Sequence, residues 1–133
     1  MPEIDVAIRE FLRQRAGGHC EYCRITDRLT LAEHEIDHVI AVKHGGSGVV
    51  QNLAFCCTVC NRFKGSDIAS IDPESGQLTR LFHPRVDGWD EHFRFHDGHI
   101  VALSAVGRFT VRLLRMNRTA RVRERKLMRR SQS

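Results

Sequence analysis

The order of hydrophobic and polar residues predicts a chain that mixes helices with short strands. Apolar side chains recur at helical spacing over residues 4–12, and Gly17-Gly18 would end that first helix. Residues 31–40 follow a strand pattern, which the glycine-rich run over 43–48 interrupts. Residues 53–56 form a second short apolar segment, so we expect two neighbouring strands joined by a glycine-rich loop.

The last third of the chain predicts a β-hairpin and two more helices. Residues 92–96 and 99–103 flank Asp97-Gly98, a dipeptide that favours the two-residue type I′ turn. Apolar residues over 106–116 mark an amphipathic helix, and Thr119 is a suitable cap for a final helix over 119–130. No internal repeat or low-complexity linker divides the chain, so we expect one domain of the α+β class.

The net charge of +5 hides a strong asymmetry along the chain. Residues 108–133 hold ten basic residues and one acidic residue, Glu124, which leaves the rest of the chain acidic. Such an excess of cations is typical of a nucleic-acid-binding segment, whereas a solvated helix face usually carries both signs of charge. We therefore expect this basic tail to contact phosphates through Arg121, Arg125 and Arg129.

The length, hydropathy and cysteine count of the chain argue against a secreted, membrane or disulfide-rich protein. A chain of 133 residues buries roughly two thirds of its unfolded surface, so a bound metal would help to stabilise it. Residues 1–15 mix apolar and charged side chains, which argues against a signal peptide or a membrane span and favours the cytoplasm. In that reducing compartment paired cysteines more often hold a metal than form disulfides, and the odd number of five cysteines agrees with this.

Two Cys-x-x-Cys pairs predict a structural zinc site. Each pair bends the chain so that both sulfurs can meet one metal, and two pairs complete a tetrahedral set of thiolates. The expected ligands are Cys20, Cys23, Cys57 and Cys60, which leaves Cys56 as a small buried apolar residue. A redox dithiol is the alternative, but no β-α-β pattern surrounds either pair.

The residues between and after the cysteine pairs resemble the HNH endonuclease family. Asp37-His38 is followed by Gly45-Gly46 and Asn52-Leu53, and the run ends in Cys57-Thr-Val-Cys60-Asn61-Arg-Phe-Lys64-Gly65. The similarity covers residues 20–66, and a later segment over 107–117 is similar to the end of small bacterial members.

This resemblance implies a fold as well as a function. Residues 20–66 would form a ββα-metal core, in which a short helix over 58–64 follows the two strands. Residues 67–133 would add a C-terminal elaboration with the hairpin and the basic helices, within a single domain over 1–133. Asn61 stands where many members of the family have a histidine, a variation that the family tolerates.

The resemblance assigns roles that suit the chemistry of phosphodiester hydrolysis. A histidine whose pKa lies near neutrality can deprotonate the attacking water, and this role falls to His38. Asp37 and Asn61 offer oxygen atoms to a divalent cation, with Mg²⁺ or Mn²⁺ expected. Asn52 has both a donor and an acceptor, so it can hold the loop through backbone hydrogen bonds.

Two further residues are expected near the phosphate. Lys64 follows Asn61 by three positions, so both would project from one face of the short helix. His44 lies in the glycine-rich loop close to the expected site. Neighbouring side chains on a straight strand point to opposite faces, so Asp37 and His38 can both reach one phosphate only if the chain bends there.

These residues together favour a metal-dependent DNA endonuclease that leaves 5′-phosphate and 3′-hydroxyl ends, as the family resemblance implies. A zinc-dependent DNA-binding module without cleavage is the alternative, although such a module has no need for Asp37, His38, Asn52 and Asn61 together. A thiol redox protein is a weaker alternative, and it would carry free, reactive thiols. Monomer and homodimer both remain open.

Overall fold

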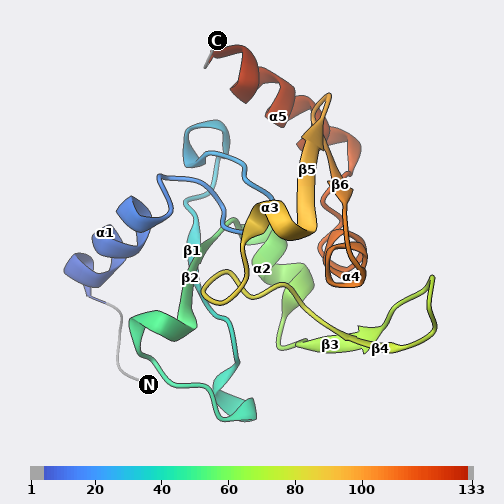
Figure 1. The fold of residues 1–133 in the computed structure, drawn as a ribbon. Helices are drawn as coiled ribbons and strands as arrows, with labels where there is room; N and C mark the ends of the chain where they lie inside the picture. The colour runs from blue at the N-terminus through green and yellow to red at the C-terminus, as the bar shows by residue number, and fades with distance from the viewer. Residues whose placement is uncertain (1–4, 132–133) are drawn as a thin grey trace.

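The computed structural model describes residues 5–131 as helices joined by three short antiparallel hairpins (Figure 1). The order of elements is α1 (Val6–Arg15), β1 (Glu35–His38), β2 (Leu53–Cys56), α2 (Thr58–Lys64), β3 (Ala69–Ile71), β4 (Leu78–Arg80), α3 (Trp89–His92), β5 (Phe93–His96), β6 (His99–Ala102), α4 (Ala105–Leu113) and α5 (Thr119–Ser131), with single 3₁₀ turns at Asp27–Leu29, Val42–His44 and Val50–Asn52. Over the described residues, no helix combines the length and the apolar character needed to cross a membrane.

Helix α1 lies within the predicted range and begins at a polar cap. The Asp5 side chain accepts a hydrogen bond from the backbone N–H of Ile8 at 2.8 Å, which satisfies a free donor of the first turn. The predicted helix also included residue 4, which lies outside the described residues. Arg15, the last residue of α1, donates to the carbonyl of Leu53 at 2.6 Å and so ties the helix to β2.

Strands β1 and β2 pair in antiparallel register, with Asp37 opposite Ala54 and His38 opposite Leu53. Strand β1 is shorter than the predicted segment over 31–40. The loop between the strands folds back so closely on the residues after β1 that a Cβ atom on Gly46 would lie 1.7 Å from the carbonyl oxygen of Ile40. Only glycine fits there.

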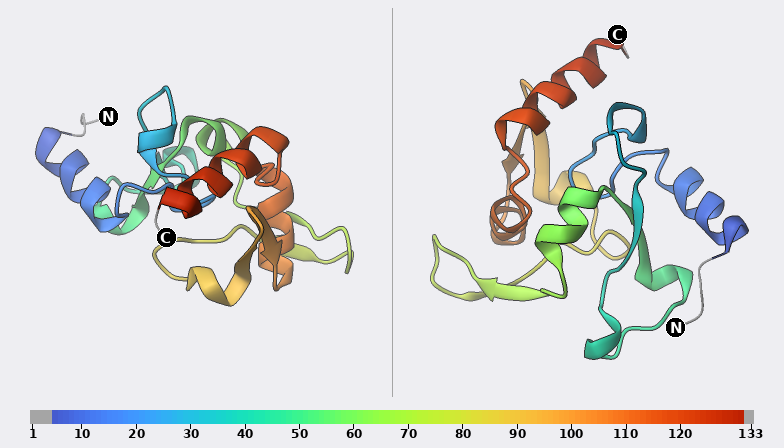
Figure 2. Two further views of the ribbon diagram at one scale, coloured as in Figure 1. Left: turned by 90° about the horizontal axis from the view of Figure 1, so that it is seen from above. Right: turned by 180° about the vertical axis from the view of Figure 1, so that it is seen from behind.

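The predicted helix after β2 is present as α2, and a further hairpin follows it. Strands β3 and β4 pair with Ala69 opposite Arg80 and Ile71 opposite Leu78, and the sequence analysis did not predict this hairpin. This hairpin extends away from the rest of the molecule in all three views (Figures 1 and 2). Arg108 of α4 holds it where the turn between the strands begins, because its guanidinium contacts the carboxylate of Asp72 at 3.0 and 3.3 Å.

The C-terminal hairpin turns at Asp97-Gly98, as the dipeptide predicts. Both residues have positive φ angles, 49° and 79°, which a type I′ turn requires. Helix α4 then packs closely where α3 meets the hairpin, since a Cβ atom on Gly107 would lie 2.3 Å from the carbonyl oxygen of His92, the last residue of α3, and 3.3 Å from the Cβ of Ala102 in β6. Helix α5 follows and lies across the tip of the β5–β6 hairpin (Figure 1).

An aromatic cluster joins the N-terminal and C-terminal halves of the chain. Phe82 packs edge-on against Tyr22 and Phe93, with ring centroids 6.3 and 5.2 Å apart. Trp89 stacks near Phe93 and donates its indole N–H to the carbonyl of Tyr22 at 2.9 Å. Because Tyr22 lies between two cysteines, this cluster places the second half of the chain directly against the cysteine cluster.

Candidate functional site

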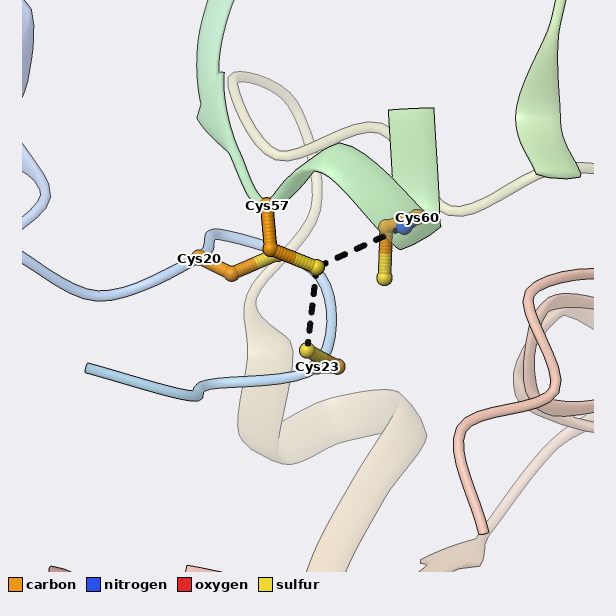
Figure 3. Close-up of side chains that lie close together, drawn as sticks. All are labelled: Cys20, Cys23, Cys57 and Cys60. Carbon is orange, nitrogen blue, oxygen red and sulfur yellow. Dashed lines mark hydrogen bonds between the residues drawn. The ribbon is translucent and has the colours of Figure 1, made fainter. Parts of the chain in front are cut away.

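Four cysteine side chains converge in the interior of the protein (Figure 3). The sulfur atoms of Cys20, Cys23, Cys57 and Cys60 all lie within 4.8 Å of one another, and the sulfurs of Cys23 and Cys57 are 3.8 Å apart. Tetrahedral zinc with Zn–S bonds of about 2.3 Å places its sulfur ligands about 3.8 Å apart. The donor set and its spacing therefore fit a structural zinc ion, as the sequence predicts.

Local structure explains how each pair reaches the cluster. The Cys20 backbone N–H donates to the carbonyl of Ile25 at 2.8 Å, which closes a tight turn around the first pair. Cys57 is the N-cap of α2, and its sulfur accepts the backbone N–H of Cys60 at 3.4 Å. The N-terminus of a helix also stabilises a thiolate. Cys56 lies outside the cluster, as expected, with its thiol directed to the carbonyl of Cys57.

The protonation of the cluster depends on how its thiols are buried and bonded. Burial raises the pKa of the Cys20 and Cys23 thiols. Hydrogen bonds with the other thiols, of which the Cys20 thiol has the largest effect, raise the pKa of Cys60. Hydrogen bonds with Cys20, Cys23 and Cys60, the one with Cys20 having the largest effect, lower the pKa of Cys57. Zinc binds cysteines as thiolates, so zinc binding would displace the protons that burial favours on these thiols.

Two arginines of α5 reach the cluster from the C-terminal end of the chain. The guanidinium of Arg121 donates to the sulfur of Cys57 at 3.5 Å, and that of Arg125 donates to the carbonyl of Cys23 at 3.4 Å. Their residues are only 2% and 0% exposed. The prediction that these two arginines contact phosphates is therefore corrected, because α5 packs both inward, Arg121 against the sulfur of Cys57 and Arg125 against backbone carbonyls. Arg129 is exposed over the ring of Phe95, and its role in DNA binding stays a prediction.

Asp37 is buried in an ion pair with Lys64. The Lys64 ammonium lies 3.1 Å from one oxygen of Asp37 and 3.2 Å from the carbonyl oxygen of His38, and the Tyr22 hydroxyl donates to the other carboxylate oxygen at 2.8 Å. Burial raises the pKa of Asp37, while Lys64 and Tyr22 oppose that rise. Lys64 is 1% exposed, so in this structure it pairs with Asp37 rather than facing solvent, where the sequence placed it to meet phosphate.

His38 ends β1 without the bend that the sequence analysis required. The antiparallel register continues regularly through His38, so its side chain and that of Asp37 leave the strand on opposite faces. The His38 side chain is half-buried, and among the described residues its ring has no hydrogen-bond partner. The imidazole is thus available to a bound molecule, whereas the carboxylate of Asp37 faces α2.

Asn61 has a partner that the sequence analysis did not assign. Its side-chain amide donates to a carboxylate oxygen of Glu35 at 3.1 Å. Glu35 precedes Asp37 by two positions on β1, so the period of the strand places both carboxylates on the face toward α2. That alternation was the signal in the sequence that could have identified Glu35.

Asn52 makes the backbone hydrogen bonds that its side chain predicted. Its carbonyl oxygen accepts the N–H of Ile40 at 2.9 Å, and its amide donates to the carbonyls of Ile40 at 3.0 Å and Ser47 at 2.7 Å. These bonds close the loop that follows His38. His44 is exposed on the 3₁₀ turn within this loop, and it makes no side-chain contact with the described residues of the site.

Comparison with known proteins relates the segment that contains this site to a known family. Residues 20–67 match the family model described as HNH endonuclease, which spans 48 of the 133 residues. No curated protein and no solved structure matches the chain. The family resemblance of this matched segment is thereby confirmed, together with a four-cysteine cluster inside a mixed α and β fold. The match indicates a nuclease or DNA-binding function for this segment.

Proposed function

We propose that this protein is a metal-dependent DNA endonuclease that hydrolyses phosphodiester bonds to 5′-phosphate and 3′-hydroxyl ends. The observation that carries the proposal is the free imidazole of His38, which lies beside a loop closed by Asn52 inside the segment of the HNH family. Strands β1 and β2 and helix α2 form the ββα-metal core over residues 20–66. Residues 67–133 elaborate it within a single domain over 1–133.

His38 acts as the general base in this proposal. Its ring nitrogen takes a proton from water, the water oxygen forms a bond to phosphorus, and the bond from phosphorus to the 3′ oxygen breaks. The departing 3′ oxygen then takes a proton from solvent. General-base catalysis of this kind typically contributes ~10²–10⁴ in rate. Asn52 serves the reaction indirectly, because its hydrogen bonds to Ile40 fix the chain that follows His38.

A divalent cation, Mg²⁺ or Mn²⁺, would be held by Asp37 and Asn61, whose oxygen atoms are the donors that such ions prefer. When bound, the ion would neutralise charge on the phosphate and stabilise the leaving oxygen. Lys64 now pairs with Asp37, so ion binding at Asp37 requires the chain to release this ammonium. Asn61 gives only its amide N–H to Glu35 and keeps its oxygen for an ion. Asp37 and His38 leave β1 on opposite faces, so the chain must also bend between them for both to act on one phosphate.

The proposal also assigns a structural role to zinc and identifies DNA as the substrate. Cys20, Cys23, Cys57 and Cys60 would hold structural zinc, which needs reduced thiols and so agrees with a cytoplasmic location. DNA is the substrate, and His44 and Arg129 remain candidates for contact with its phosphates because both are exposed.

Purified protein incubated with supercoiled plasmid and Mg²⁺ or Mn²⁺ tests the proposal. Wild-type protein should nick or linearise the plasmid, and His38→Ala should retain zinc and DNA affinity but lose roughly two to four orders of magnitude in rate. Cleavage by the variant at the wild-type rate would contradict the role of His38.

The buried ion pair of Asp37 with Lys64 is the observation that favours a non-catalytic DNA-binding module, because a lysine already neutralises the proposed metal ligand. Plasmid binding without cleavage in either metal would support that second function.

A further inference from the structure

Three arginines outside the cysteine cluster have no acidic partner among the described residues. Arg62 lies on α2, Arg112 lies in the last turn of α4 and Arg115 lies just after that helix; all three are exposed. The guanidinium groups of Arg62 and Arg115 lie 5.4 and 4.6 Å from the ring centre of Phe63. One aromatic ring therefore joins the cations of α4 to those of α2, the helix of the HNH segment.

A groove of about 600 Å³ opens beside these arginines, between the β3–β4 hairpin and α4. Arg112 and Arg115 lie along it, and Ile71, Phe109 and Leu113 form apolar walls. None of its lining residues is acidic. We call it the basic groove. Two uncompensated guanidinium groups over low-dielectric walls attract anions strongly.

The backbone of Arg115 gives an independent reason to look for function here. Its φ angle is +48°, in the left-handed region, where glycine is usual. The turn around it has the hydrogen bonds of a helix C-terminus, since the N–H of Met116 donates to the carbonyl of Val111 at 3.1 Å. Glycine would adopt this conformation at a lower cost in free energy, so the presence of an arginine here indicates that its side chain has a function.

We propose that Arg62, Arg112 and Arg115 form a surface that binds the phosphodiester backbone of DNA, with the basic groove as its centre. This inference rests on the proposed function and extends it to residues outside the matched segment. Guanidinium groups bind phosphate oxygens with two parallel hydrogen bonds, which suits a surface that selects the backbone rather than the bases. Asn61 precedes Arg62 on α2, so DNA held by these arginines passes next to the candidate site.

Salt-dependent binding tests this surface. The parent protein carries His38→Ala, so that DNA stays intact, and its affinity for a short labelled duplex is measured by fluorescence anisotropy between about 50 and 200 mM salt. Arg112→Gln with Arg115→Gln should lower the slope of log affinity against log salt by about 1.8, which is about 0.9 for each lost phosphate contact. The matched control is Arg28→Gln with Arg94→Gln, which removes the same charge from exposed positions away from the groove.

Two outcomes would overturn the proposal: a slope equal to that of the parent, or an equal loss of slope in the control pair. Arg115→Gly guards against misfolding, because it relieves the left-handed backbone. It should unfold at or above the temperature of the parent and still lose about 0.9 of slope. If the salt slope of Arg115→Gly equals that of the parent protein, the result would contradict the proposed DNA-binding surface.

The endonuclease proposal is judged separately, by plasmid cleavage with wild-type protein. If cleavage is absent and only the groove variants lose slope, the DNA-binding surface stands and the catalytic proposal fails. If cleavage is present and the groove variants keep the parent slope, the surface fails and the catalytic proposal stands.

Discussion

Two asparagine side chains, each with a hydrogen-bond donor and an acceptor, hold two connecting segments of this protein in place. Asn52 bonds to both the N–H and the carbonyl of Ile40, at 2.9 and 3.0 Å. Asn117 does the same to Ile100, at 2.7 and 2.8 Å. Each asparagine takes the place of a strand partner for one residue, so the backbone groups of Ile40 and Ile100 do not remain unpaired. The first closes the loop after His38, and the second anchors the start of α5.

Replacement of Lys64 can distinguish the contribution of Asp37 to stability from its proposed role as a metal ligand. Lys64→Met removes the ammonium and leaves the Asp37 carboxylate buried and unpaired, which should cost about 3–5 kcal/mol of unfolding free energy. If Asp37 is an ion ligand, Mn²⁺ should raise the melting temperature of Lys64→Met more than that of wild-type protein, because the competing cation is gone.

The control for this experiment is Asp37→Asn combined with Lys64→Met, which lacks the charged ligand and should not respond to Mn²⁺. Thermal unfolding followed by circular dichroism, with and without Mn²⁺, provides the measurement. An equal response in all three proteins would remove Asp37 from the ion site.

Among the elements, those with a strong local signal were predicted well from the sequence. The helix over 58–64 and the strand over 53–56 lie where the pattern placed them, and Asp97-Gly98 forms the predicted turn. The β3–β4 hairpin was missed because its exposed strands show no clear alternation and depend on contacts with α4. Short strands of this kind gain their stability from packing rather than from propensity.

The candidate site was predicted only in part, for a related reason. The cysteine ligands and the bonds of Asn52 follow from residue type and spacing, which the sequence contains. The inward direction of Arg121 and Lys64 depends on which buried anions lie opposite them, namely the thiolate of Cys57 and the carboxylate of Asp37. A run of basic residues does not distinguish an exposed phosphate contact from a buried counter-ion.

The contact between Arg108 and Asp72 should make the attachment of the β3–β4 hairpin sensitive to acid. Hydrogen bonds from Arg108 hold the pKa of Asp72 well below its ordinary value. A carboxyl whose pKa is lower in the folded state stabilises the fold above its unfolded pKa, about 4, and this contribution disappears as the pH falls further. We therefore expect Arg108→Gln to lower the melting temperature at pH 7 and to weaken its dependence on pH below about 4.

Melting temperatures of wild-type and Arg108→Gln protein across this acid range provide the measurement. Arg112→Gln, which removes an exposed charge from the same helix, is the matched control and should keep the wild-type acid profile. Parallel acid profiles for Arg108→Gln and wild-type protein would show that the contact contributes nothing to the attachment.

At the scale of the whole molecule, charge balance links the two ends of the chain. Four thiolates around a zinc ion would carry two net negative charges in this buried site. Arg121 and Arg125 bring two positive charges to the same place, and Arg125 also donates to the carbonyls of Gly98 and Met116 at 2.7 and 2.6 Å. Buried charges are tolerated only when they are paired and hydrogen-bonded. Helix α5 and the zinc site should therefore stabilise each other.

This coupling predicts that Arg121→Gln weakens zinc binding although Arg121 is not itself a ligand. Loss of a hydrogen bond to a ligand typically costs 10–100-fold in metal affinity, so we expect about that loss here, measured by competition with a zinc chelator. Arg123→Gln, an exposed neighbour on α5 with the same change in charge, should keep wild-type affinity. Zinc removal should also expose α5 to limited proteolysis before the β5–β6 hairpin, because the arginines lose their counter-charge first. Equal zinc affinities for the two variants would mean that α5 covers the cluster without stabilising its charge.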